Sequence, residues 1–125
     1  MKQIIATSNA PAAIGPYSQA VEVNGTLYIS GQIPVNPATG KIERFNIKDQ
    51  TEQVFANIAA ILKAADYGFG NVVKTTVFLA DMKLFAEMNE VYKQHYPTAS
   101  PARSTVAVKA LPLDALVEIE TVAVK

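Results

Sequence analysis

The sequence of 125 residues has no cysteine and a single histidine, His95. Because there is no thiol, disulfides, thiolate metal sites and cysteine nucleophiles are excluded. One histidine disfavours a transition-metal site built by one chain, and we expect neither a metal nor another cofactor. A serine–histidine–acid triad would have to use His95, which lies at the end of a predicted helix before Pro97. A histidine at that position more often interacts with the helix C-terminus.

Long apolar runs and a surplus of one charge are also missing. No stretch reaches the roughly 18 apolar residues of a membrane span, and MKQIIATSNAPAAIG (1–15) has no apolar core of signal-peptide length. Eleven basic residues, of which only Arg44 and Arg103 are arginines, balance eleven acidic residues. Such a balance gives no broad electrostatic footprint for nucleic acid or an anionic membrane. We therefore expect a soluble, cytoplasmic protein and disfavour membrane and nucleic-acid partners.

Half of the residues are hydrophobic and 18% are charged, which is typical of a folded chain of one domain, residues 1–125. Periodicity and turn residues predict a series of elements along it. In order, we expect strands over 17–23 and 26–30 around Asn24-Gly25, a loop over 31–40, a helix capped by Asn46 and ended by Gly68, a strand over 72–80, a helix capped by Asp81 and ended before Pro97, and strands over 103–109 and 115–124, with an optional short strand over 2–5.

This order predicts an α+β fold. Two helices cannot cover both faces of a five- or six-stranded sheet, so we expect both helices on one face. The other face remains rich in valine, isoleucine and small residues. An uncovered face of that kind indicates that another copy of the chain packs on it, which makes oligomerisation a hypothesis of the sequence itself.

The last strand, ALVEIETVAV (115–124), carries two glutamates on one face. Glu118 and Glu120 are two residues apart, so in an extended chain they point the same way. We expect the preceding strand to pair with it in the antiparallel sense, with Thr105 near Glu120 and Arg103 one pair further along. Two interpretations stay open. One is an exposed cross-strand ion pair; the other is a small polar site in which Arg103 binds a substrate carboxylate and a glutamate acts as base.

Several stretches resemble the RidA (YjgF) family of reactive-intermediate deaminases. They are NAPAAIGPYSQA (9–20), SGQIPVNPATG (30–40), VVKTTVFLAD (72–81) and PARSTVAVKALPLDALVEIETVAV (101–124). The resemblance spans essentially the whole chain, and P-A-R-S followed by E-I-E is its most distinctive part. It implies a chorismate-mutase-like α+β sandwich with one mixed sheet. It also implies a homotrimer whose sheets form a central barrel, with sites in the clefts between subunits.

The activity that this resemblance implies is hydrolysis of 2-imino acids and their enamine tautomers to 2-oxo acids and ammonia. The substrates include 2-aminoacrylate, 2-iminobutanoate and 2-iminopropanoate, which arise from pyridoxal-phosphate dehydratases. By the same resemblance, Arg103 binds the substrate carboxylate and Glu118 positions and activates the attacking water. Other positions that match substrate-binding positions of the family are Tyr17, Ser30, Gly31, Asn89 and Thr105.

Thr105 departs from family members that have cysteine at this position. The family's contact there is mainly backbone-mediated, so we expect threonine to leave the activity intact; a shift in substrate preference stays open. From the pattern alone Tyr17, Ser30, Gly31 and Asn89 also have ordinary structural interpretations, and Glu120 either tunes Glu118 or pairs with a cation.

Three other functions are alternatives. The first is a trimeric binding module for small carboxylates such as 2-oxo acids, which would keep Arg103 and not need Glu118. The second is an RNA-directed translation inhibitor or ribonuclease, which the neutral charge balance disfavours. The third is chorismate mutase, which shares the fold but binds a dianionic substrate that demands more cations than Arg103 alone.

Overall fold

The computed structural model describes residues 1–125, which form one main sheet, a small hairpin and two helices. The main sheet has six strands in the order β1-β2-β3-β8-β6-β7. These strands are β1 (Gln3–Ile5), β2 (Ala20–Val23), β3 (Thr26–Gln32), β6 (Val72–Leu79), β7 (Ala102–Ala107) and β8 (Val117–Val124). The small hairpin pairs β4 (Val35–Asn36) with β5 (Lys41–Ile42). The helices are α1 (Ile47–Ala64) and α2 (Phe85–His95), with short 3₁₀ turns at Phe69–Asn71, Met82–Leu84 and Pro112–Asp114.

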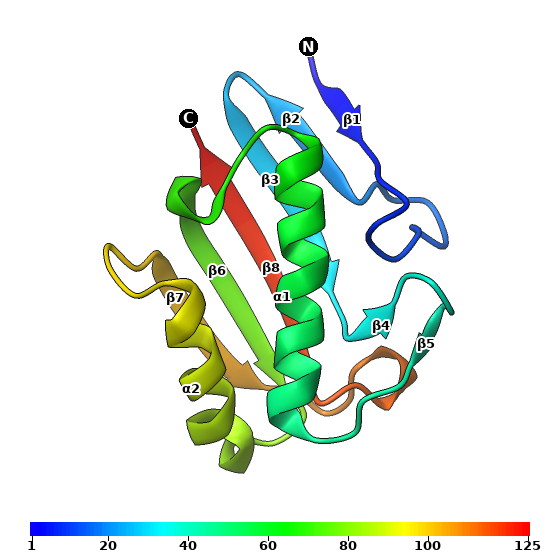
Figure 1. Cartoon of the computed structure of the whole chain (residues 1–125), viewed down its shortest axis with the longest axis vertical. Coiled ribbons are helices and arrows are strands. Elements are labelled where there is room, and N and C mark those ends of the chain that lie inside the picture. The colour runs from blue at the N-terminus through cyan, green and yellow to red at the C-terminus, as the bar shows by residue number, and fades with distance from the viewer.

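Both helices lie on the same face of the main sheet, as the sequence predicts (Figure 1). In the view of Figure 1, α1 crosses in front of β3 and β8, and α2 lies in front of β7. A core of 22 buried residues fills the space between helices and sheet, with Phe55, Leu27 and Ile119 fully buried. The α+β fold with one mixed sheet is therefore confirmed, because β6 and β7 are parallel and the other neighbours are antiparallel. No helix is long and apolar enough to cross a membrane.

The predicted hairpin is present, although its first strand is shorter than expected. Asn24 and Gly25 both have positive φ, at 50° and 78°, as a tight two-residue turn requires. The first strand begins at Ala20 rather than at residue 17. Before it, the Gln19 side chain bonds to backbone atoms of Thr7, Ala10 and Pro11 and so holds the preceding loop. The optional strand near the N-terminus is present as β1.

The long helix begins as predicted but ends earlier. Asn46 caps it, with its Oδ1 accepting from the Asp49 backbone N–H at 2.9 Å. The residue that leaves the helix with left-handed backbone is Asp66, at φ 64°, whereas Gly68 is extended and opens a 3₁₀ turn. The prediction that Gly68 ends the helix was therefore wrong, because an aspartate can also adopt this conformation.

The expected pairing of the last two strands was wrong. The strand β8 does not pair with β7; it lies between β3 and β6, and β7 is an edge strand parallel to β6. The burial pattern gives the physical reason. Val117, Ile119 and Ala123 are fully buried, so β8 gains most at the centre of the sheet, whereas the residues of β7 are exposed or half-buried.

One consequence is that the cation and the carboxylates do not share a face. Glu118 pairs with Phe78 and Glu120 with Thr76, on the face that the helices leave uncovered. Arg103 pairs with Thr75, whose side chain is buried under the helices. Direct partners on neighbouring strands project to the same face, so Arg103 lies on the opposite face from both glutamates.

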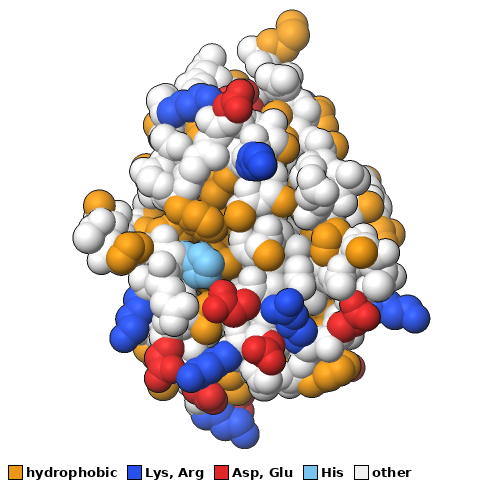
Figure 2. Space-filling view, viewed as in Figure 1, with side chains coloured by type: hydrophobic (Ala, Val, Ile, Leu, Met, Phe, Trp, Pro, Cys, Tyr) orange, Lys and Arg blue, Asp and Glu red, His pale blue; other side chains and the backbone are white.

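The uncovered face of the sheet is largely apolar, as expected. Ile4 and Tyr28 are 54% and 50% exposed, and Val106 and Val124 also project there. On the helix-covered face, charged side chains gather toward the end where α1 begins, as Figure 2 shows. The contrast leaves one face of the molecule with an apolar sheet surface and no covering layer.

Candidate active site

Arg103 is held against α2 by three side chains. Its Nη1 donates to Asn89 Oδ1 at 2.8 Å. Its guanidinium carbon lies 4.5 Å from the centroid of the Tyr92 ring and 5.3 Å from that of Phe85. Rings at these distances attract a cation through their electron-rich faces. The guanidinium is therefore fixed by one hydrogen bond and two aromatic contacts, all from α2.

No carboxylate of the chain pairs with Arg103. The ion pairs join Lys48 to Glu90, Lys83 to Asp81 and His95 to Glu52. The cleft beside the guanidinium is lined in part by Asn89, Lys93, Ser100 and Arg103 itself. A half-buried guanidinium with donors to spare in a cleft suits a planar carboxylate, which it can bind through two nitrogens. The open interpretation of an exposed cross-strand ion pair with Glu118 or Glu120 was wrong.

Thr105 lies two residues beyond Arg103 on the same face of β7. Its Oγ1 is buried and has no hydrogen-bond partner. A buried hydroxyl without a partner costs about 1–3 kcal/mol relative to a satisfied one. Thr105 therefore presents a polar atom, next to the Arg103 position, that the chain itself does not satisfy.

Glu118 is half-buried on the opposite face, where its carboxylate rests against the backbone of Gly31. A Cβ built at Gly31 would collide with the Glu118 carboxylate, and would lie 2.9 Å from its Cδ. The missing side chain of Gly31 thus leaves the space that the Glu118 carboxylate occupies, and a larger residue would displace the carboxylate from it. Burial, and then the nearby charge of Glu120, raises the pKa of the Glu118 carboxyl above its ordinary value.

Gly31 and Ser30 lie where the pairing of β3 with β8 is irregular. The register shifts between Ile29 and Gln32, which is a β-bulge. Ser30 Oγ donates to the Ser18 carbonyl oxygen at 2.6 Å, so it anchors the segment that carries Tyr17. Tyr17 is 54% exposed and lines a cavity together with Gly31. The structure thus brings Glu118, Gly31, Ser30 and Tyr17 into one neighbourhood.

The predicted site residues therefore fall into two groups. We call Asn89, Arg103 and Thr105, with Phe85 and Tyr92, the cation half-site. We call Tyr17, Ser30, Gly31 and Glu118 the carboxylate half-site. The two half-sites belong to different faces of the same sheet.

Sequence reasoning did not identify Phe85 and Tyr92 as parts of the cation half-site. A signal was available, because Phe85, Asn89 and Tyr92 follow one another at intervals of four and three residues. That spacing places all three on one side of a helix. Tyr92 is 5% exposed, so it packs in the core and also contacts Arg103.

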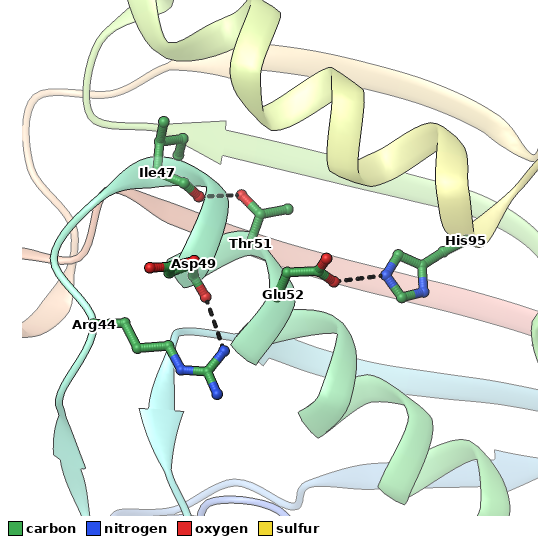
Figure 3. A network of polar contacts seen from close by, with 6 residues as sticks. All are labelled: Arg44, Ile47, Asp49, Thr51, Glu52 and His95. Atoms are coloured by element: carbon green, nitrogen blue, oxygen red, sulfur yellow. Dashed lines mark hydrogen bonds and ion pairs between the residues drawn. The ribbon is translucent and has the colours of Figure 1, made fainter.

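The single histidine belongs to neither half-site. His95 ends α2, and its Nε2 lies 3.1 Å from Glu52 Oε1 of α1 (Figure 3). Its ring stacks on Phe55 at 4.2 Å between centroids. Arg44, the only other arginine, bonds to the Asp49 carbonyl oxygen at the start of α1. His95 thus joins α2 to α1, and Arg44 joins the loop before α1 to the first turn of that helix. No three histidine, cysteine or acidic side chains converge as a metal site would require.

Comparisons with known proteins match nearly the whole chain. A family model described as endoribonuclease L-PSP matches residues 7–125. A RutC family protein of Pyrococcus horikoshii is 54% identical over 125 residues, which cover 100% of this chain and 99% of that protein. The 2-iminobutanoate/2-iminopropanoate deaminase of Mus musculus is 48% identical over 125 residues, which cover 100% of this chain and 93% of that protein.

A solved structure extends the likeness to the fold. The crystal structure of E. coli TdcF with bound serine superimposes with a TM-score of 0.94 at 44% identity. The match covers 98% of each of the two chains. Sequence and structure comparisons therefore agree over the same length of chain.

Proposed function

Because the chain belongs to the RidA (YjgF) family of reactive-intermediate deaminases, we propose that it hydrolyses 2-imino acids to 2-oxo acids and ammonia. The substrates that we propose are 2-iminobutanoate, 2-iminopropanoate and the enamine 2-aminoacrylate. The relative from Mus musculus carries the first two of these in its name. The structure of E. coli TdcF with serine supports a site for small ligands of amino-acid size.

One observation carries the proposal. Arg103 and Glu118 are opposite charges, each without an ionic partner in the chain, on opposite faces of one sheet. A small substrate cannot reach across a sheet, so each half-site needs a complement from another copy of the chain. The carboxylate of a 2-imino acid complements Arg103, and its electrophilic C2 complements a base such as Glu118.

We therefore also propose a homotrimer in which the three uncovered sheet faces form a central barrel. The apolar uncovered face supports this, because burying Ile4, Tyr28, Val106 and Val124 against neighbours removes their exposed area from water. Each cleft between subunits would combine the cation half-site of one chain with the carboxylate half-site of the next. A monomeric mass by light scattering at micromolar concentration would contradict the trimer.

In this site Arg103 binds and orients the substrate. Its fork of N–H donors matches the two carboxylate oxygens, and Asn89 already fixes one of its nitrogens. Tyr17 would wall the cleft from the other chain, and the backbone at Ser30 and Gly31 would line it. Orientation matters because a positioned water reacts far faster than one that must diffuse to C2.

Glu118 would act first as base and then as acid. Its carboxylate takes a proton from water as the oxygen bonds to C2 of the iminium and the C=N electrons move to nitrogen. It then returns that proton to the nitrogen of the carbinolamine. The C–N bond breaks, the proton of the new hydroxyl leaves with ammonia as ammonium, and the 2-oxo acid remains. A raised carboxyl pKa suits a group that must first accept a proton from water and then donate it to nitrogen.

A competition assay tests the activity. An amino-acid oxidase with catalase releases imines from alanine, 2-aminobutyrate or leucine, semicarbazide traps them, and the protein competes for them. We expect slower semicarbazone formation with the wild-type protein, and no effect with Arg103→Ala or Glu118→Ala. The imines of alanine and 2-aminobutyrate are the kind that pyridoxal-phosphate dehydratases release, so such enzymes are the functional partners we propose.

Two outcomes would redirect the proposal. A folded trimer that binds 2-oxobutyrate but never slows trapping would favour the carboxylate-binding module. The description of the family model names a ribonuclease; salt-sensitive RNA retention in a filter assay would favour that activity. The balanced charge of the chain speaks against the second outcome.

A further inference from the structure

Tyr92 contacts the guanidinium of Arg103 more closely than any other aromatic ring does. The distance from the guanidinium carbon to the ring centroid is 4.5 Å, against 5.3 Å for Phe85. Tyr92 itself is 5% exposed, so this contact is made largely out of water, where attraction between cation and ring is strongest. The ring therefore forms one wall of the space in which the guanidinium lies.

The Tyr92 ring is held in turn by the sheet. Its hydroxyl lies 2.6 Å from Thr75 Oγ1, and Thr75 is 1% exposed. Burial raises the pKa of the Tyr92 phenol, so the phenol keeps its proton, and either hydroxyl can be the donor in this bond. A buried hydrogen bond at the tip of the ring fixes its tilt as well as its position.

The register of the sheet places Thr75, which holds the Tyr92 ring, directly beside Arg103. Thr75 on β6 is the direct partner of Arg103 on β7. Thr75 therefore fixes the ring that lies against Arg103, while the backbone beside Thr75 fixes the strand from which Arg103 projects. Asn89, one turn earlier on α2, fixes one nitrogen of the guanidinium.

We propose that Tyr92 is a positioning residue for substrate binding: its ring, anchored by Thr75, sets the plane in which the Arg103 guanidinium presents its donors to the substrate carboxylate. The inference rests on the proposed function and deepens it. It assigns the affinity for the carboxylate to a chain of three residues, Thr75, Tyr92 and Arg103. A residue that only filled the core would affect folding but would not act on KM through Arg103.

The test measures KM and kcat for the imine derived from 2-aminobutyrate, and the Kd for 2-oxobutyrate by calorimetry. We expect Tyr92→Leu to raise KM and Kd roughly 10-fold while kcat changes less than about 3-fold, because the lost ring acts on binding. Tyr92→Phe and Thr75→Val keep the ring but lose its anchor, and we expect each to raise KM roughly 3-fold. A KM within error of wild type in all three variants would overturn the proposal.

Tyr96 supplies a matched control. It is also 5% exposed, its ring packs against Tyr92, and it lines the same cleft. Its buried hydroxyl has no partner, however, and the rings that lie over the Arg103 guanidinium are those of Phe85 and Tyr92. We expect Tyr96→Phe to leave KM unchanged. If Tyr96→Phe raises KM as much as Tyr92→Phe does, the effect is one of core packing and the proposal fails. Should Tyr92→Leu not fold, the comparison of the two phenylalanine variants decides.

A double variant tests whether Tyr92 acts through Arg103. Arg103→Lys cannot present a planar fork to the carboxylate. We therefore expect Tyr92→Phe to raise KM less than about 1.5-fold in the Arg103→Lys protein, against roughly 3-fold in the wild type. If Tyr92→Phe raises KM by the same factor in the Arg103→Lys protein as in the wild type, the proposal is overturned. A protein that binds 2-oxobutyrate without hydrolysing imines would contradict the proposed deaminase activity. The Kd values of the variants for 2-oxobutyrate would still test the role of Tyr92.

Discussion

Arg103 is held by three side chains of α2, whereas Glu118 rests against a glycine at a bulge in β3. The contacts of Arg103 are direct and specific: a hydrogen bond to Asn89 and two aromatic faces. Glu118 has no hydrogen-bond partner of this kind, and its neighbourhood is set by space left open at Gly31. Arg103 of β7 thus takes its supporting contacts from one helix, whereas the surroundings of Glu118 on β8 are loop segments and an interrupted strand pairing.

This difference fits the two tasks of the proposed reaction. Binding a carboxylate benefits from a guanidinium that is already oriented, because little freedom is lost on binding. A group that takes a proton and then returns it to another atom benefits from space to move, and a raised carboxyl pKa favours the return of the proton. The segment that follows Gly31 is held by a contact further along the chain: Asn57 of α1 donates to the carbonyl oxygens of Ile33 and Val35.

The largest effect should come from the base. We expect Glu118→Gln to lower kcat by about 10²–10⁴-fold, because the amide keeps the shape of the side chain but cannot take a proton. The Kd for 2-oxobutyrate should change little, since Arg103 supplies most of the affinity. Glu120→Gln, on the same face, is the matched control and should keep most of the activity. An equal loss of kcat in both variants would mean that negative charge on this face of the sheet is needed, and not the Glu118 carboxyl in particular.

The next largest effect tests the space at Gly31. We expect Gly31→Ala to lower kcat by roughly 10–10²-fold, because the new Cβ displaces the Glu118 carboxylate from its position. The displaced atoms are the far end of a flexible side chain, so the thermal stability should fall little. Kinetics combined with a melting curve check both parts. A large loss of stability with normal kcat in the folded fraction would contradict the assignment of Gly31.

Much of the fold could be predicted from the sequence because its signals are local. Asn24-Gly25 specifies a tight turn and Asn46 a helix start from neighbouring residues alone, and both predictions were confirmed. The pairing of β7 with β6 was missed because no local residue specifies it. It follows from the competition of whole strands for the buried centre of the sheet, which β8 occupies.

The candidate site was predicted residue by residue but not in its arrangement. The strand pattern offered Arg103 and one of the two glutamates as one open interpretation, and the family resemblance selected Glu118. One error in strand pairing was enough to put them on one face. Side-chain direction alternates along a strand, so the face of a residue depends on register and neighbours. Tyr92 was missed for another reason: a buried aromatic residue on a helix reads as core, and nothing in its own pattern reveals a contact with a distant arginine.

A smaller effect concerns pH. Burial and the charge of Glu120 raise the pKa of Glu118, so its carboxyl is protonated, and inactive as base, up to a higher pH than an ordinary glutamate. We expect kcat/KM to fall as pH decreases through this raised pKa. Glu120→Gln removes the like charge and should move the acid limb to lower pH, which gives a few-fold higher relative rate on that limb. Full pH profiles of both proteins check this, and an unchanged or upward-shifted limb would contradict it.

The smallest effect concerns the Thr105 hydroxyl, in the cation half-site. Its buried Oγ1 lacks a partner within the chain, so removing it should not cost the stability that a satisfied hydroxyl contributes. We expect Thr105→Val to leave the melting temperature unchanged or slightly raised, and Thr105→Cys to keep kcat within about 2-fold of wild type. If instead Thr105→Val raises KM several-fold while Thr105→Ser does not, the hydroxyl itself contacts the substrate. The cation half-site would then hold its ligand by a side-chain donor next to Arg103, and the mainly backbone contact expected at this position would be wrong.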